Sequence, residues 1–300
     1  MVLPTTTTRS TGTPAADRHA SPTRPLHARW ARHLPTVLLV GAAAAFLLPL
    51  WVMLAGSLKS MDEIRHGSLL LPPWRPTLGA WRQAIDALAP GVVNSLLITV
   101  PAVLLSTLLG ALSGYALAFS RWRAGSRALS NLLVLAAFIP LQLFLYPAVL
   151  GLAWVGLFGS VAGAVLAHVV FGLPLTTILF KGHFEQLPLE LLRAAQIDGA
   201  GFARTFFSVV LPVSMPMCAV VMLLQFTGIW NDFIVGLVFA GAENRPMTVQ
   251  FTNIVGTTFG ERAYNVEMAS ALFTAALPLV VYFYSGRLFV RGVLSGAVKG

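Results

Sequence analysis

The chain has 300 residues, of which 56% are hydrophobic and only 10% are charged, whereas about a quarter of the residues in a soluble domain are charged. This composition excludes an ordinary soluble domain and indicates a polytopic membrane protein. The net charge of +9 is typical of basic cytoplasmic loops in such a protein. It does not indicate nucleic-acid binding, because no basic stretch is interleaved with aromatic residues.

The N-terminal segment differs from the rest of the chain. Residues 1–30 are rich in Thr, Ser, Pro, Ala and Arg without periodicity, so we expect residues 1–33 to form a disordered cytoplasmic tail. The apolar run from Leu34 to Gly56 is too long for the core of a signal peptide and long enough to cross a bilayer. The membrane domain is therefore expected over residues 34–300.

Six apolar segments are predicted to span the membrane as helices, which makes the chain an all-α membrane protein. Gly110 and Gly114 form a G-x-x-x-G pattern in the second of these segments, which permits close approach of another helix. Proline occurs inside several of them, and membrane helices tolerate it where neighbours satisfy the freed carbonyl groups. The predicted spans are residues 34–57, 92–119, 130–154, 161–181, 213–240 and 268–290.

Loop charge predicts the orientation of these spans. Most of the 20 Lys and Arg residues fall on the side that holds both termini and a loop at about residues 182–212. This side is expected to be cytoplasmic, because cytoplasmic loops carry the excess of basic residues. The large outside segments are then residues 58–90 and 241–266, which carry Trp74 and Trp81 and either lie along the membrane or face an external partner.

Sequence patterns for catalysis are absent from this chain. No G-x-x-x-x-G-K-[ST] sequence occurs, so the chain has no P-loop with which to bind ATP. The six His residues are scattered without metal-ligand spacing, and the single cysteine, Cys218, cannot form an intrachain disulfide. We therefore expect no enzyme activity, no catalytic residue, no metal site and no cofactor in this chain.

The most informative segment is residues 187–216, a polar and small-residue-rich stretch between two apolar runs. Pro188 suits a first helical turn, and Glu190 in that turn complements the positive end of the helix dipole. Ala194 and Ala195 predict a flat helix surface that a partner can approach closely. Asp198-Gly199 then ends the pattern, since Gly is the usual residue just past a helix C-terminus, and Pro212 and Pro216 mark the return to the membrane.

These residues carry a resemblance to a known family. The run from Glu190 to Ala200, followed by Leu211-Pro212, resembles the "EAA" loop of binding-protein-dependent ABC importer permeases. The resemblance extends over roughly residues 34–300. Arg193 departs from it, because many members have a second Glu there. The carbohydrate branch is indicated by Asn94-Ser95-Leu96, Trp230–Phe233 and Gly296–Gly300. Within this branch, the chain most resembles the glucose/mannose permeases at Leu145-Tyr-Pro147, Phe226–Phe233, Pro246–Gln250 and Tyr264-Asn-Val266.

The resemblance implies a permease of the type I ABC importer fold in the inner membrane, with both termini in the cytoplasm. It implies four partners: a second permease subunit, two ATPase subunits that bind ATP and Mg, and an extracytoplasmic sugar-binding protein. Membrane lipid surrounds the chain. A helix at residues 189–198 would insert into a cleft of one ATPase, with Glu190, Ala194, Ala195, Asp198 and Gly199 as the coupling residues. The alternative to ATPase docking is a folded cytoplasmic loop that only caps the end of the helix bundle.

Polar residues inside the predicted spans are candidates for a translocation path. Asp232 is a carboxylate in an apolar run, which is costly to bury without a partner, and Trp230 and Asn231 beside it add an aromatic face and hydrogen-bonding groups suited to a sugar. The competing interpretation is that Asp232 forms a polar contact that holds two helices together. Gln142 and Gln225 either line the path or bond a neighbouring helix.

Two other functions remain open. A secondary transporter or channel acting alone would usually carry more intramembrane charge and matching broken helices in two repeats. An ABC permease for a non-sugar solute would share the loop, but the Trp230–Phe233 and Gly296–Gly300 segments favour a sugar.

Overall fold

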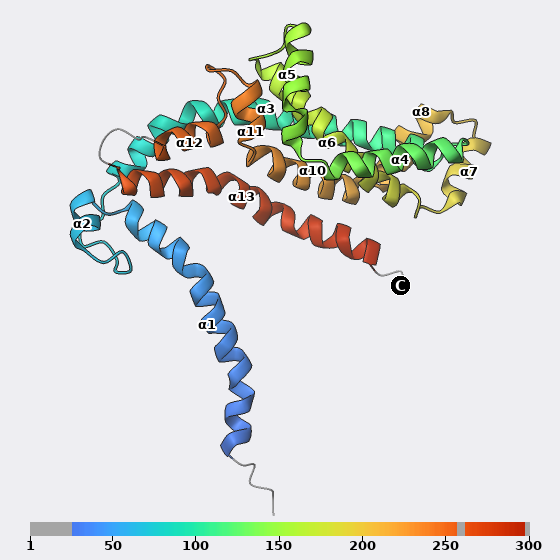
Figure 1. The fold of residues 1–300 in the computed structure, drawn as a ribbon. Coiled ribbons are helices and arrows are strands. Elements are labelled where there is room, and N and C mark those ends of the chain that lie inside the picture. Colours follow the sequence, from blue (N-terminus) through green and yellow to red (C-terminus); the bar gives the residue numbers. More distant parts are fainter. Residues whose placement is uncertain (1–25, 257–261, 298–300) are drawn as a thin grey trace, which may run out of the picture. The chain divides into compact units, whose positions relative to one another are not determined.

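The computed structural model describes residues 26–256 and 262–297, and every regular element in these ranges is a helix (Figure 1). The chain divides into two compact units, residues 1–50 and 51–300, and the described part of the second unit forms a bundle. The elements are α1 Leu26–Ser57, α2 Met61–His66, α3 Gly79–Ala118, α4 Arg123–Phe138, a 3-10 turn Leu141–Phe144, α5 Leu145–Trp154, α6 Val161–Phe184, α7 Leu189–Ile197, α8 Phe202–Thr205, a π turn Phe206–Val210, α9 Leu211–Val213, α10 Met215–Trp230, α11 Ile234–Phe239, α12 Met247–Val255 and α13 Tyr264–Ala297.

The prediction of an all-α membrane protein is confirmed. Within the described ranges, 4 segments are single helices long and apolar enough to cross a membrane: Leu34–Ser57, Gly79–Ala118, Val161–Phe184 and Tyr264–Ser285. Two bent helix pairs raise the number to 6 if each pair counts as one span. The predicted third and fifth spans are therefore wrong as continuous helices.

The third predicted span, residues 130–154, is broken at Pro140. The segment Arg123–Phe138 meets Leu141–Trp154 at an angle of 103°. Proline lacks a backbone N–H, and its ring clashes with the carbonyl four residues earlier. It also pushes the preceding residue out of the helical region, and Ile139 accordingly has extended dihedrals, φ −72° and ψ 131°.

The fifth predicted span, residues 213–240, is interrupted at both ends. Phe202–Val213 and Met215–Trp230 are bent by 80° where Pro216 occupies the first turn of α10 and cannot donate to a carbonyl in α9. At the other end α10 stops at Trp230, and α11 starts only at Ile234. The span is thus assembled from short helices.

Two boundaries also differ from the prediction. The helix α3 begins at Gly79 rather than near residue 92 and continues through Pro90. Just after this proline, the Gly91 N–H donates a hydrogen bond of 3.0 Å to Gln250 Oε1. The helix α1 begins at Leu26, within the segment predicted to be a disordered tail, since residues 26–33 contain no Gly or Pro to stop it. Residues 1–25, 257–261 and 298–300 lie outside the described residues, so the predicted tail is untested there.

The core of the bundle is the packing of α3 along α6, which lie side by side in Figure 1. Gly110 and Gly114 face α6 so closely that a Cβ atom at Gly114 would lie 2.8 Å from the Lys181 backbone nitrogen and 2.9 Å from the Thr177 carbonyl oxygen. Such contacts leave no room for a side chain, so the close approach predicted from the G-x-x-x-G pattern is confirmed.

Candidate functional site

The polar loop between α6 and α10 contains a short helix with a well-formed end. The helix α7 spans Leu189–Ile197, follows Pro188 and has Glu190 in its first turn, so the predicted helix at residues 189–198 is matched to within one residue. Beyond Asp198, Gly199 adopts a left-handed φ of +73°. Its N–H donates to the Gln196 carbonyl at 3.0 Å, and the Ala200 N–H donates to the Ala195 carbonyl at 2.9 Å. This pair of bonds is the Schellman motif, which satisfies the last carbonyls of a helix.

One face of α7 is anchored to the bundle. Leu192 is buried, and Ala195 is only 6% exposed. Leu192 lies where α7 covers an aromatic cluster formed by α3, α6 and the π turn. The expectation that Ala194 and Ala195 together form a flat surface for a partner is therefore wrong for Ala195. At about 100° per residue, adjacent residues on a helix point in different directions, so only Ala194 is exposed.

The opposite face of α7 is exposed and partly apolar. Ile197, the last residue of the helix, is 86% exposed. Glu190 and Ala194 share this face by helical spacing and are exposed as well. An exposed apolar side chain beside polar ones is a candidate contact for a partner protein.

An aromatic cluster links the α7 loop to the long helices. The ring of Tyr115 in α3 lies 4.8 Å from the ring of Phe202 in α8 and 5.3 Å from that of Phe206 in the π turn, centroid to centroid. The ring of Phe184, at the end of α6, lies 6.1 Å away. A displacement of the loop would therefore act on α3 and α6 through close-packed rings. Tyr115 and Phe184 were not predicted as functional residues, because aromatic residues are ordinary in apolar helices.

A second constellation joins motifs that are far apart in the sequence. The Ser95 hydroxyl accepts a hydrogen bond of 2.8 Å from the Met247 N–H, and Asn94 Nδ2 donates to the Arg245 carbonyl at 3.2 Å. The Thr248 hydroxyl donates to the Asp232 carbonyl at 2.7 Å. The three motifs that hold Asn94-Ser95, Asp232 and Pro246–Gln250 thus form one network between α3, α12 and the start of α11.

Within this network Asp232 has a defined role. One carboxylate oxygen, Oδ1, accepts hydrogen bonds from the Val235 N–H at 2.6 Å and the Gly236 N–H at 3.4 Å. These are free N–H groups of the first turn of α11, so Asp232 caps that helix. The cap explains why α10 does not continue through residues 231–233.

The other predicted path residues lie in different environments. Trp230 is 2% exposed, stacks on Phe226 with centroids 5.7 Å apart and therefore packs the core in this structure. Asn231 is exposed and bonds back to the Thr227 carbonyl. Gln142 is exposed on the 3-10 turn, whereas Gln225 is buried against Gly172, where a Cβ atom would lie 2.7 Å from the Gln225 Oε1 atom.

We expect Ser95→Ala to destabilise the bundle by about 1–3 kcal/mol, because it leaves the buried Met247 N–H without an acceptor. The measurement is the thermal unfolding midpoint of the purified chain in detergent. Ser68→Ala is a control, because its hydroxyl accepts only from the exposed Leu70 N–H. Equal midpoints for both variants would contradict the role given to Ser95.

The described residues contain no group of three or more His, Cys, Asp or Glu side chains that could hold a metal ion. The two constellations described above consist of a capped helix end, packed aromatic side chains and hydrogen bonds to the backbone.

Comparison with known proteins gives a consistent result. The family described as "binding-protein-dependent transport system inner membrane component" matches residues 106–294. The osmoprotective compounds uptake permease protein GgtD of Synechocystis sp. is 38% identical over 69% of this chain and 69% of its own length. The glucose import system permease protein GlcU of Saccharolobus solfataricus is 30% identical over 85% of this chain and 91% of its own. A chain of a bacterial ABC transporter involved in alginate import has the same fold, with a TM-score of 0.75 at 20% identity over 89% of this chain and 99% of that one.

Proposed function

The chain belongs to the family of binding-protein-dependent transport system inner membrane components, and on that premise we propose that it is the sugar-translocating permease subunit of an ABC importer. The observation that carries the proposal is α7. It is a short helix anchored by Leu192 and Ala195, stopped by Gly199 and presenting an exposed apolar tip at Ile197. Such a helix can pass the movement of a docked protein to the bundle through the Tyr115 ring cluster.

This geometry supports the following coupling step. A partner ATPase receives the outer face of α7, with Glu190 and Asp198 offering charged groups at its rim. ATP and Mg bind to the ATPase subunits and not to this chain. When the two ATPases close, α7 moves with one of them and displaces α3 and α6 at Tyr115 and Phe184, which changes the side of the membrane to which the path is open.

The proposed assembly contains a second permease subunit, two ATPase subunits and an extracytoplasmic binding protein. The α7 loop and both termini lie in the cytoplasm, as the distribution of Lys and Arg supports. On the opposite side, the network around Asn94 and Arg245 faces the binding protein.

A mono- or oligosaccharide is the proposed substrate, and glucose and mannose are the first candidates. The name of GlcU supports this choice, as do the motifs at Phe226–Phe233 and Pro246–Gln250. The name of GgtD supports a second candidate class, osmoprotective compounds.

The test is uptake of labelled solutes by cells that lack the chain and by cells complemented with it. We expect complementation to restore ATP-dependent uptake of a sugar, and Asp198→Lys to abolish it without reducing the amount of chain in the membrane. Uptake of an osmoprotective compound alone would replace the sugar by the second candidate. Normal sugar uptake by Asp198→Lys would contradict a coupling role for this residue.

Ile197→Asp is expected to reduce the amount of ATPase that co-purifies with the chain by about tenfold. The reason is that a carboxylate would have to be desolvated at the centre of the contact. Ile197→Leu keeps the apolar tip and is the matched control. Quantitative mass spectrometry of the affinity-purified complex measures the ratio of the two proteins. An unchanged ratio in Ile197→Asp would place the contact elsewhere.

A further inference from the structure

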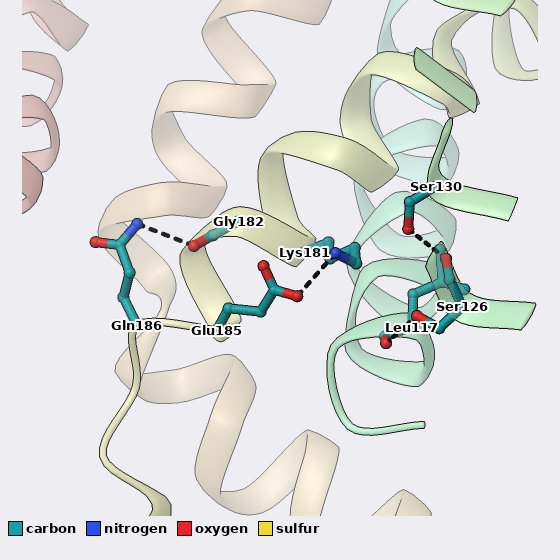
Figure 2. A network of polar contacts seen from close by, with 7 residues as sticks. All are labelled: Leu117, Ser126, Ser130, Lys181, Gly182, Glu185 and Gln186. Atoms are coloured by element: carbon teal, nitrogen blue, oxygen red, sulfur yellow. Dashed lines mark hydrogen bonds and ion pairs between the residues drawn. The ribbon is translucent and has the colours of Figure 1, made fainter. Parts of the chain in front are cut away.

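A groove of about 740 Å³ lies beside α7, between the end of α3, the start of α4 and the end of α6. Four basic side chains line it: Arg123, Arg127, Lys181 and Arg193. Glu185, the acidic residue among its lining residues, is bound to Lys181 at 2.7 Å (Figure 2). Within the described residues the three arginines have no ion-pair partner, so the groove carries an uncompensated positive charge.

The backbone around the groove adds to this charge. The helix α4 starts at Arg123, and no side chain caps its first turn. Free N–H groups at a helix N-terminus favour an anion, and phosphate oxygens are common ligands there. The helices α3 and α4 are joined at this side of the groove, because the Ser126 hydroxyl of α4 donates to the Leu117 carbonyl of α3 at 2.7 Å (Figure 2).

An apolar groove of about 630 Å³ is continuous with the basic one, since Leu117, Ser120 and Ser126 line both. It runs along α4 past Trp122, Leu129 and Leu132. Trp122 is 74% exposed, and the two leucines are exposed as well. From Arg123 to Leu132 the helix rises by roughly 14 Å at 1.5 Å per residue, which is close to half of the ~30 Å hydrocarbon core of a bilayer.

We propose that the two grooves together bind one anionic phospholipid of the bilayer, with its phosphate among Arg123, Arg127 and Arg193 and an acyl chain along Leu129 and Leu132. The basic groove alone would suit a soluble phosphate equally well. The apolar groove favours a lipid over a soluble phosphate, because it shares lining residues with the basic groove and follows α4. Together with Leu141–Trp154, α4 forms a bent pair that is long and apolar enough to cross a membrane. Basic pockets between membrane helices are suited to anionic head groups in this way.

The site has a consequence for α7. Leu189, Leu192, Arg193 and Gln196 of α7 also line the basic groove, so a phosphate held between Arg193 and Arg123 would tie α7 to the start of α4. Lipid binding would then restrain the same helix that carries the exposed Ile197.

The test uses the full chain in vesicles of phosphatidylcholine that contain either brominated phosphatidylglycerol or brominated phosphatidylcholine, with quenching of Trp122 fluorescence as the readout. The part of the quenching that is lost in Trp122→Phe reports brominated lipid bound beside Trp122 in this groove. We expect the Trp122 component to show a several-fold preference for phosphatidylglycerol. Arg123→Gln with Arg127→Gln should abolish that preference, since the two basic residues together contribute about 2 kcal/mol at an anionic lipid surface, or about 30-fold.

The matched control is Arg121→Gln, an exposed arginine of the same loop that lines neither groove. It should keep the preference. No preference in the unmodified chain, or equal losses in all arginine variants, would overturn the proposal.

Two further outcomes also count against it. Displacement of the quenching lipid by millimolar glycerol phosphate would assign the basic groove to a soluble anion. Absence of any Trp122 quenching by either lipid would show that protein covers the apolar groove.

Discussion

Gly199→Pro abolishes sugar uptake while leaving the amount of chain in the membrane unchanged: this is the largest effect that we expect at the α7 loop. Gly199 has φ +73°, whereas the proline ring holds φ near −65°. The substitution also removes the N–H that donates to the Gln196 carbonyl. The end of α7 therefore has to rearrange, which turns Ile197 and Asp198 away from the partner. Uptake of labelled sugar and quantitative membrane blots measure the two quantities.

Two controls separate backbone conformation from loss of space. A Cβ atom at Gly199 would meet nothing within 4 Å, so the defect is conformational. Gly199→Asn should retain most of the uptake, because Asn tolerates the left-handed region better than other side chains. Gly201→Ala, at a glycine with φ −74°, should behave like the unmodified chain. Normal uptake by Gly199→Pro would contradict the account of α7 as a rigid coupling helix.

Gly114→Val is expected to prevent stable packing of α3 on α6, with a loss of about 3 kcal/mol or more in the free energy of unfolding. The first added atom, Cβ, would lie 2.8 Å from the Lys181 nitrogen and 2.9 Å from the Thr177 carbonyl oxygen. Both belong to the backbone of α6, which cannot move aside as a side chain can. The yield of monodisperse chain in detergent and its unfolding midpoint measure the effect.

The control for this prediction is Gly151→Val. Gly151 is also helical, but a Cβ atom there would meet nothing within 4 Å. This variant tests valine in a helix without a clash and should cost only a fraction of that loss. Equal unfolding midpoints for the two variants would mean that α3 and α6 can separate without cost.

Several parts of the structure could be predicted because local chemistry determines them. Asp198-Gly199 after a helical pattern predicts a helix end, because Gly is the usual residue there, and the structure places the end of α7 within one residue of the prediction. The spacing of Gly110 and Gly114 likewise predicts close packing without knowledge of the partner helix. The long apolar runs predict spans for the same reason.

Other features depend on contacts between distant residues and could not be predicted. Pro140 was expected to be tolerated inside a straight span, as Pro101 is in α3, yet it bends the chain by 103°. Whether proline kinks or breaks a helix depends on which neighbours satisfy the freed carbonyls. Trp230 was expected to offer an aromatic face to a sugar, but it stacks on Phe226 inside the core. Its environment is created by α3, α12 and α13 together.

The Asn94-Ser95, Asp232 and Pro246–Gln250 motifs illustrate the same limit. Each could be found in the sequence by itself, and none indicates the others as its partners. The structure joins them by hydrogen bonds from Met247 to Ser95 and from Thr248 to Asp232. In this chain the three motifs thus belong to one structural network.

The central claim is that the outer face of α7 docks on a cytoplasmic ATPase, and site-directed crosslinking tests it most directly. Ile197→Cys places a thiol at the exposed tip, while the natural Cys218 is buried. Trp74→Cys, at a side chain that is 85% exposed on the other predicted side of the membrane, is the control. We expect a crosslink from residue 197, and not from residue 74, to a protein that peptide mass spectrometry identifies as an ABC ATPase. Absence of this product from residue 197, or its formation from residue 74, would contradict the account.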